Sequence, residues 1–398
     1  MKILIVSQQF YPEEFRINEI TKELVKEGHD VTVLTGLPNY PSGIIPKKYK
    51  FFRNRKENIF GAKIIRTFEI ARKNSALGLI LNYISFMFSS SFKAVFMKKD
   101  FDIIYVYQLT PVTMLLPGII VKKIKRIPLF CYTLDLWPES VKNIIKNENN
   151  IIFKTTDFIS RVLYKSCDSI GVTSKSFTKY FLTKHKIQNK KLIYLPQHSE
   201  RYTEDLNSRL DNCIDFMFMG NIGKAQDYET ILFATKKIEK KENFKVHFVG
   251  EGSEYENCKL LTKELDIEDK IIFHGRHPVE DMPKFYKLAD ACLLTLKGGN
   301  EISLTLPAKL QGYMSAGKPI IAAIDGSAQE VIRDSGSGYY VNSGEVDGLS
   351  EIMERFIRDT PETKKIMGEN SRKYFENEFS IEKHLVKLEK ILNSLIKK

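Results

Sequence analysis

Short apolar runs alternate with amphipathic stretches along the whole chain, and this pattern predicts alternating strands and helices. The first helix is the clearest, because Ile17, Ile20 and Leu24 share one face and Gly28 follows the last turn. The predicted strands of the first half are 2–6, 31–35, 63–68, 103–107, 128–132, 169–173 and 192–195. Those of the second half are 215–219, 245–249, 271–273, 291–295, 319–323 and 338–341. This order predicts an α/β protein with two doubly wound parallel sheets.

The length of 398 residues fits two domains of roughly 150–200 residues each. A polar stretch at 195–213 predicts the linker between them. The five cysteines are scattered without a CxxC pair, which favours a reduced cytosolic compartment over a disulfide framework or a zinc site. The chain opens directly on a strand-like run, so we expect no secretory signal.

Charge is divided unevenly along the chain. Residues 1–191 hold 32 lysines and arginines against 15 aspartates and glutamates, a net charge of +17, whereas the remainder carries −5. Such asymmetry predicts that the first half meets an anionic surface or substrate. Since no nucleic-acid-binding motif accompanies the charge, we expect no nucleic-acid partner and favour the anionic inner face of the cell membrane.

The stretch 76–99 is the most apolar of the first half, and its large side chains recur at helical spacing. Asn82, three serines and Lys93 interrupt it, so the sequence predicts a poor membrane span. Two interpretations stay open: a buried core or interdomain helix, and a helix whose aromatic face enters lipid or holds a lipid tail. The residues of this apolar face are Leu77, Leu81, Ile84, Phe88, Phe92 and Phe96.

Glycine turns follow several predicted strands of the second half, at 218–231 and 248–254, and Arg276 follows another strand. Ligands of such sheets bind at the carboxyl ends of the strands. The turns match neither the GxGxxG dinucleotide pattern nor the phosphate loop, which argues against hydride transfer and ATP hydrolysis. The turn at 305–309, before a predicted helix that Gly317 closes, also offers backbone N–H groups and Lys309 to an anion. Together these features predict a site for a phosphate-bearing nucleotide.

The segments "PNYPSG", "DLWPES", "GNIGKAQ" and "LPAKLQGYMSAGKPIIA" occur in an order that resembles the retaining glycosyltransferases of family 4, with the GT-B fold. Their combination resembles the WbuB-like branch of O-antigen and capsule assembly. The resemblance implies two Rossmann-like domains facing a cleft. The first, 1–195, would bind the acceptor and be completed by a helix at 381–398, and the second, 196–380, would bind the nucleotide-sugar.

The chain departs from the family pattern at several positions, four of them in its second half. The family's two glutamates, eight positions apart, fall on Leu304 and Gly312, and its usual arginine and lysine fall on Asn221 and Gln226. Backbone N–H groups and nearby cations would then stabilise the leaving diphosphate. One of the family's two glutamates contacts the ribose of the donor, and either Glu330 or Glu251 would take its place here. The implied donor-binding residues are Gly220, Asn221, Gly223, Lys224, Gln226, Gly250, Arg276, Thr305, Leu306, Pro307, Lys309 and Glu330.

On the acceptor side, Asp135 and Glu139 of "DLWPES" are the candidate catalytic residues, and Trp137 offers an apolar plate to a sugar. An alternative is that Asp135 caps a helix beginning near Pro138. The departing phosphate of a retaining enzyme can also take the proton. The other candidate acceptor-binding residues are Arg16, Asn18, Asn39 and Tyr40.

These features predict a metal-independent retaining glycosyltransferase that needs no cofactor beyond its donor. It would move a sugar, N-acetyl-L-fucosamine by resemblance, from a UDP-sugar to a lipid-linked saccharide. Its partners would be the nucleotide-sugar donor, that acceptor and an anionic membrane surface, at the cytoplasmic face. The "DFD" motif at 100–102 is predicted to be a solvated turn, not a metal site. The alternatives are a nucleotide-sugar epimerase on the same fold and a non-catalytic nucleotide-sugar-binding partner of an assembly complex.

Overall fold

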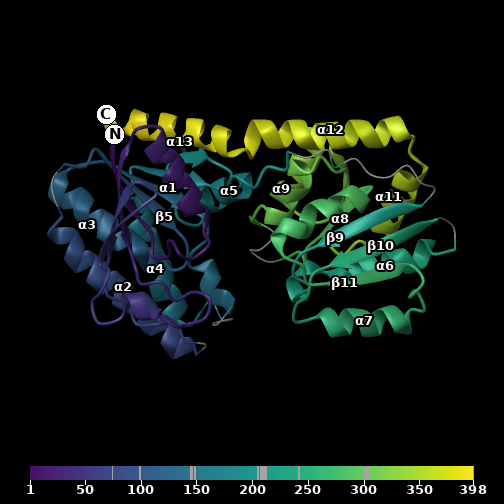
Figure 1. The fold of residues 1–398 in the computed structure, drawn as a ribbon, viewed down its shortest axis with the longest axis horizontal. Coiled ribbons are helices and arrows are strands. Elements are labelled where there is room, and N and C mark those ends of the chain that lie inside the picture. The colour runs from purple at the N-terminus through teal and green to yellow at the C-terminus, as the bar shows by residue number, and fades with distance from the viewer. Residues whose placement is uncertain are drawn as a thin grey trace. The chain divides into compact units, whose positions relative to one another are not determined.

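The computed structural model describes residues 1–73, 75–97, 100–143, 147, 149–203, 206, 213–240, 243–299 and 304–397. The chain divides into two compact units, one formed by residues 1–196 with 384–398 and the other by residues 197–383 (Figure 1). Parts of the predicted linker 195–213 and of the stretch 76–99 lie outside the described residues. Lys398 of the predicted final helix does so too.

The first unit contains a sheet in the order β3-β4-β2-β1-β5-β6-β7-β8 among its described residues. Its strands are β1 (Lys2–Val6), β2 (Asp30–Thr35), β3 (Lys56–Ile59), β4 (Ala62–Arg66), β5 (Ile103–Gln108), β6 (Leu129–Thr133), β7 (Ser169–Val172) and β8 (Leu192–Tyr194). Its helices are α1 (Arg16–Lys26), α2 (Ala76–Val95), α3 (Leu115–Lys125), α4 (Ile151–Lys165), α5 (Lys175–Thr183) and most of α13 (Ile381–Ile396). Four 3₁₀ turns join them, at Lys47–Tyr49, Val112–Met114, Glu139–Asn143 and Asn189–Lys191.

The parallel pairing of this sheet confirms the predicted α/β class, with one exception at its edge. Strand β3 runs antiparallel to β4, with Lys56 opposite Ile65 and Ile59 opposite Ala62. The hydrophobic pattern does not predict this strand, because a polar edge strand has no apolar run to mark it. The remaining pairs of the sheet are parallel within the described residues.

The second unit contains a parallel sheet in the order β11-β10-β9-β12-β13-β14 among the residues described. Its strands are β9 (Ile214–Met219), β10 (Phe244–Val249), β11 (Ile271–Gly275), β12 (Ala291–Thr295), β13 (Ile320–Ala323) and β14 (Gly338–Val341). Its helices are α6 (Tyr228–Ile238), α7 (Tyr255–Glu264), α8 (Met282–Leu288), α9 (Ala308–Ser315), α10 (Ser327–Ser335), α11 (Val346–Arg358) and α12 (Pro361–Glu378). Among the fully described elements of this unit, 3₁₀ turns lie at Lys224–Gln226 and Val279–Asp281.

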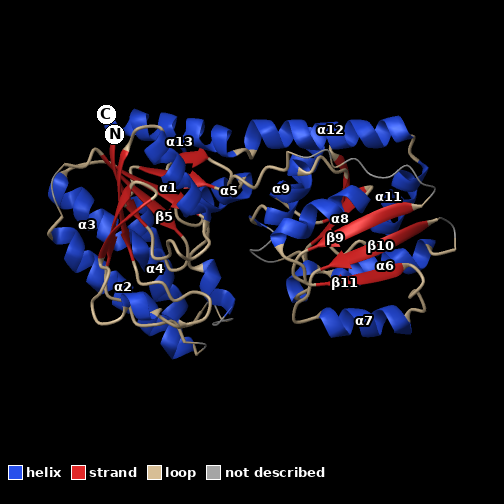
Figure 2. Cartoon of the chain, in the orientation of Figure 1, coloured by secondary structure: helices blue, strands red, loops and turns tan. Residues whose placement is uncertain are grey.

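Both faces of this second sheet are buried. Successive side chains of a strand point to opposite faces, and β9 accordingly sends Met217 and Met219 into one apolar cluster and Phe216 and Phe218 into another. Figure 2 shows helices flanking the strands of each unit. The arrangement is the doubly wound architecture that the alternating pattern predicts.

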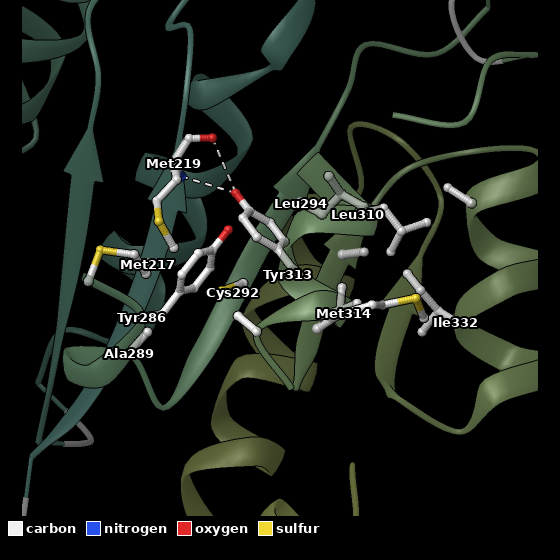
Figure 3. Close-up of a cluster of buried hydrophobic side chains, with 14 of the residues drawn as sticks. Met217, Met219, Tyr286, Ala289, Cys292, Leu294, Leu310, Tyr313, Met314 and Ile332 are labelled. Atoms are coloured by element: carbon white, nitrogen blue, oxygen red, sulfur yellow. Dashed lines mark hydrogen bonds between the residues drawn. The ribbon is translucent and has the colours of Figure 1, made fainter. Parts of the chain in front are cut away.

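Helix α9 is fixed to the end of β9 by one buried side chain. The Tyr313 hydroxyl accepts a hydrogen bond from the Met219 N–H at 3.0 Å and donates one to the Met219 carbonyl at 3.3 Å (Figure 3). Leu310 and Met314 pack into the same apolar cluster. These contacts set the start of α9, where Lys309 lies, against the glycine turn that follows β9.

Candidate functional site

Two glycines let the carboxyl ends of neighbouring strands approach closely in the second unit. Gly220 has φ +112° and Gly250 has φ +138°, a region that disfavours residues with a side chain. A Cβ added at Gly250 would lie 2.1 Å from the Gly220 carbonyl oxygen. The Gly220 N–H donates to the Val249 carbonyl, and the Gly250 N–H donates to the Gly275 carbonyl, both at 2.8 Å. The backbone is therefore packed tightly at the edge where this fold class binds ligands.

A cavity of about 860 Å³ opens at this edge, and we call it the glycine-turn cavity. The structure brings the predicted donor residues Gly220, Asn221, Gly250 and Arg276 to its wall. Glu251, one of the two candidates for a ribose partner, also lines it. The full lining is Gly220, Asn221, Val249, Gly250, Glu251, Gly252, Tyr255, Glu256, Arg276, His277, Val279 and Met282.

Lys309 lies against the same glycine turn. Its Nζ donates to the Asn221 carbonyl at 3.4 Å and lies 3.6 Å from the centre of the Phe218 ring. A Cβ at Gly220 would be 2.8 Å from the Lys309 Cε, so the glycine also makes room for this side chain. Burial lowers the pKa of Lys309 to about 7. An amine in this state gains a proton when an anion binds beside it.

Gln226 supports the turn internally. Its Oε1 accepts hydrogen bonds from the Gly223 N–H at 3.2 Å and from the Asn221 Nδ2 at 3.4 Å. Lys224 is exposed at the start of the 3₁₀ turn. The structure thus gives Gln226 a structural contact where the family pattern has a cation.

The remaining predicted donor residues lie near the two helix starts. Leu306 packs against the apolar cluster of Figure 3, Pro307 precedes the first residue of α9, and Glu330 lies in the first turn of α10. Of the described residues, those lining the glycine-turn cavity do not include Thr305, Leu306, Pro307, Lys224 or Glu330. Their donor role stays a prediction.

In the first unit, Asp135 is held at the end of β6. Its Oδ2 accepts a hydrogen bond from the Thr110 Oγ1 at 2.9 Å, and the Trp137 Nε1 donates to that same hydroxyl at 3.2 Å. Burial raises the pKa of Asp135, and the hydrogen bonds from Thr110 oppose the rise. The bond to Thr110 gives its carboxylate a partner other than the 3₁₀ turn at Glu139–Asn143. The helix-cap alternative stays a prediction, as does the catalytic role.

Arg16 is the first residue of α1 and acts on the same region. Burial raises the pKa of the Tyr107 hydroxyl, the Arg16 charge opposes this rise and the Asp135 charge adds to it. Both charged groups therefore lie near the carboxyl end of β5. This proximity places one cation and one carboxylate around a tyrosine in the region predicted to bind the acceptor.

Glu139 is buried and engaged by its neighbours. Tyr180 donates its hydroxyl to the Glu139 Oε1 at 2.8 Å, and the Lys142 Nζ is 2.6 Å from the Oε2. The nearby Trp137 carbonyl accepts a hydrogen bond from the His185 Nε2 at 2.8 Å. These contacts hold the 134–143 segment in place, so the geometry gives Glu139 a structural environment.

The other predicted acceptor residues belong to two loops. Asn18 accepts from the Tyr11 N–H at 2.9 Å and donates to the Glu13 carbonyl at 2.6 Å, which braces the loop after β1. The N–H groups of Asn39 and Tyr40 donate to the Glu13 Oε1 at 2.7 and 2.6 Å. The Tyr40 side chain is exposed and the Asn39 side chain is buried. Glu13 thus joins the two loops at the ends of β1 and β2.

A buried carboxylate that sequence reasoning missed lies beneath these loops. The Glu69 Oε1 accepts from the Gln8 Nε2 at 2.8 Å, the Asn82 Nδ2 at 2.6 Å and the Asn39 Nδ2 at 3.3 Å. Its Oε2 accepts from the Leu37 N–H at 3.1 Å. Burial raises the pKa of Glu69 to about 8, although these donors oppose the rise. A carboxyl group directly after a predicted strand was the available signal for this residue.

The described residues also bear on the predicted metal independence and on the "DFD" turn. In the part of the chain that the structure describes, no group of three or more histidine, cysteine, aspartate or glutamate side chains is placed to hold a metal ion. In the "DFD" turn the Asp102 Oδ2 accepts from the Lys2 N–H at 2.6 Å. His29 bonds the N-terminal amine and Glu389, which is a structural arrangement. Metal independence itself stays a prediction.

Residues 205–374 match the family model described as "Glycosyl transferases group 1". The uncharacterized glycosyltransferase MJ1069 of Methanocaldococcus jannaschii is 25% identical over 416 residues, which cover 100% of this chain and 99% of the relative. The putative colanic acid biosynthesis glycosyl transferase WcaI of Escherichia coli K12 is 22% identical over 80% of this chain and 82% of its own.

Solved structures share the fold over nearly the full length. A glycosyltransferase from Rickettsia africae has a TM-score of 0.68 at 18% identity and covers 100% of this chain and 99% of its own. Anabaena Alr3699/HepE, crystallised in complex with UDP, has a TM-score of 0.71 at 16% identity, covering 99% of this chain and 100% of its own. The chain has the fold of the GT-B glycosyltransferases, and the match of residues 205–374 together with these relatives supports a glycosyltransferase of that fold.

Proposed function

We propose that the protein is a metal-independent retaining glycosyltransferase of family 4, in the WbuB-like branch, that uses a UDP-sugar. The observation that carries this proposal is the glycine-turn cavity, where Arg276 lies in the wall and Lys309 contacts the adjoining turn. Two cations beside close-packed backbone are suited to a diphosphate. A likeness to HepE, which was crystallised with UDP, supports the same ligand class.

These residues would act mainly on the leaving group. As the bond between the sugar and UDP breaks, negative charge develops on the diphosphate, and preplaced cations stabilise that charge. Lys309 would take up a proton on UDP binding because its pKa is lowered to about 7 in the free protein. Glu251, in the cavity wall, is our proposed partner for the ribose hydroxyls.

We assign the acceptor role to the first unit, with Asp135 as the carboxylate that receives the acceptor proton. Its hydrogen bond from Thr110 fixes the carboxyl group, and burial raises its pKa. The proposed acceptor is a lipid-linked saccharide of O-antigen or capsule synthesis, and N-acetyl-L-fucosamine is the proposed sugar. Relatives named for lipopolysaccharide and colanic acid synthesis support this class of product.

We place the reaction at the anionic inner face of the cell membrane, because the first 191 residues carry a net charge of +17. Within the described residues, no helix is long and apolar enough to cross a membrane. Attachment by the basic surface of the first unit is consistent with both observations.

The test is UDP release from a panel of UDP-sugars, with and without a lipid extract. Lipid-dependent release supports the proposal, whereas an epimerase interconverts sugars without releasing UDP, and a binding partner does neither. Calorimetry with UDP then tests the site: Arg276→Ala should weaken binding by roughly 1–3 kcal/mol. Arg358→Ala, which removes a cation of α11 in the same unit, is the matched control. Unchanged UDP affinity in Arg276→Ala would move the donor site away from this cavity.

A further inference from the structure

Helix α2 turns its apolar side away from the protein. The side chains of Phe88, Phe92 and Phe96 are 65%, 70% and 67% exposed. Leu77, Leu81 and Ile84 continue the same row, at a spacing of three or four residues, and are also exposed. We call these six residues the outer stripe. The sequence analysis left a buried core helix open, and the structure contradicts that interpretation for this face.

The inner side of α2 is made mainly of small and polar residues. Its buried side is formed by Gly78, Asn82, Phe86, Ser90, Ser91 and Ala94. Asn82 donates to the Glu69 carboxylate, and the Ser90 hydroxyl donates to the Phe86 carbonyl at 2.5 Å. The bond to Glu69 ties the helix to the segment that follows β4, and the bond from Ser90 lies within the helix itself. The usual arrangement, with the apolar stripe toward the core, is reversed here.

Basic groups lie next to the stripe. Helices α2 and α3 pack side by side (Figure 1), and the Lys125 Nζ donates to the Met97 carbonyl just beyond the end of α2. Lys123 and Arg126, at the end of α3, are exposed. An apolar row beside exposed cations is the pattern of a surface that enters the boundary between lipid head groups and acyl chains.

We propose that the outer stripe of α2 inserts into an anionic lipid bilayer, with the helix parallel to the membrane and the end of α3 at the head groups. A helix of 20 residues is about 30 Å long, enough to place all three phenyl rings in one shallow layer. The charge of the first unit favours anionic lipid over a second copy of this chain, which would bring like charges together. This inference deepens the proposed function only by naming the membrane-binding surface.

The experiment is co-sedimentation of the full chain with phosphatidylglycerol vesicles, without any sugar substrate. Wild-type protein should bind and stay partly bound in 1 M NaCl, where screening is shortened to ~3 Å. The double variant Phe88→Ser/Phe92→Ser should bind roughly ten- to a hundredfold more weakly in high salt, because two rings no longer leave water. Both positions are exposed, so the fold should tolerate the change.

Two further variants separate the contributions. Lys123→Gln/Arg126→Asn should weaken binding at low salt and leave the salt-resistant fraction unchanged; asparagine tolerates the left-handed backbone of Arg126 at φ +56°. Leu260→Ser/Ile366→Ser removes exposed apolar residues of the second unit. It should change neither the binding at low salt nor the salt-resistant fraction. A Phe92→Trp variant should gain fluorescence that lipids brominated on their acyl chains quench.

The proposal is overturned if Phe88→Ser/Phe92→Ser binds vesicles as strongly as the wild type. It is also overturned if the brominated lipids do not quench the fluorescence that Phe92→Trp adds. A third result would also overturn it: the wild type is a dimer that does not bind vesicles, and the double variant is a monomer. The outer stripe would then face a second copy of the chain. Binding of UDP, measured separately, tests the proposed function, and it can succeed or fail independently of the vesicle result.

Discussion

The side-chain nitrogen of Lys309 lies 3.6 Å from the centre of the Phe218 ring, at the end of the strand that leads into the glycine-turn cavity. Close contact with the ring and burial hold this lysine in one place beside Asn221. The same burial lowers its pKa to about 7, so the free protein carries a mixture of amine and ammonium near neutral pH.

We therefore expect UDP binding to be coupled to proton uptake above pH 7. The diphosphate favours the charged form of Lys309, so its pKa rises on binding. Calorimetry at pH 8 in two buffers of different ionisation enthalpy measures the protons taken up. Lys309→Met should abolish most of the uptake and weaken UDP binding by roughly 1–3 kcal/mol. Equal uptake by the variant and the wild type would assign the titration to another group.

Glu69 predicts a pH dependence of the folding stability. Burial raises its pKa to about 8, so between the ordinary value of 4.5 and about 8 the folded protein binds more protons than the unfolded chain. The free energy of unfolding should therefore fall as pH rises across that window. Glu13, whose pKa burial also raises, contributes with the same sign.

Urea denaturation at pH 5 and pH 8 checks this dependence. Glu69→Gln keeps an oxygen for Gln8 and Asn82 but cannot ionise, so the difference in stability between the two pH values should shrink. Glu13→Gln is the matched control and should shrink it less, because its acceptor bonds with Asn39 and Tyr40 oppose the shift. If wild-type stability instead rises from pH 5 to pH 8, Glu69 is not the dominant titrating group.

Asp135→Asn should lower the rate of UDP release in the presence of acceptor by about 10²-fold or more while UDP binding is retained. The asparagine oxygen can still accept the Thr110 hydrogen bond, so the change removes charge with little loss of shape. The acid limb of the wild-type pH profile should lie above the ordinary pKa of 3.8, because burial raises that of Asp135. Full activity in the variant would leave the donor phosphate as the proton acceptor.

Restoring the family's glutamates should not improve turnover. A Cβ at Gly312 would lie 3.2 Å from the Tyr286 hydroxyl, so Gly312→Glu meets crowding as well as the cost of an unpaired charge. Gly312→Ala measures the crowding alone, and Leu304→Glu tests the other position. We expect lower UDP release in both glutamate variants. Faster UDP release by Gly312→Glu would indicate that the site is a family site that has lost its glutamate. That result would support the non-catalytic alternative.

The sheets could be predicted because buried parallel strands such as β1 and β9 are continuous apolar runs. The exposure of α2 could not be predicted, because the same apolar row fits a core helix as well as a lipid-facing one. The orientation of the helix depends on contacts such as the hydrogen bond from Asn82 to Glu69. The Glu69 cluster was out of reach for a related reason. Its partners Gln8, Asn39 and Asn82 come from three distant segments, and none of them forms a motif.

The sequence indicates which residues meet in the second unit more directly than it does in the first. Glycine turns at Gly220 and Gly250 signal close backbone approach, and the structure places both with Arg276 around one cavity. The contact between Lys309 and Phe218 depends instead on Tyr313 fixing α9 to β9, which pairs residues far apart in sequence. On the acceptor side, the hydrogen bond between Asp135 and Thr110 joins two loops, and no local spacing indicates it.

The path of α13 has a consequence for how the gene can be rearranged. His29 bonds both the N-terminal amine, at 3.1 Å, and Glu389 of α13, at 2.7 Å, while His384 bonds the Pro196 carbonyl at 2.9 Å. Both chain ends thus belong to the first unit. A circularly permuted chain, opened between Pro196 and Gln197 and closed by a short linker between the original ends, would make each unit one uninterrupted segment. Either half could then be expressed, labelled or exchanged with a homologue's without cutting the other.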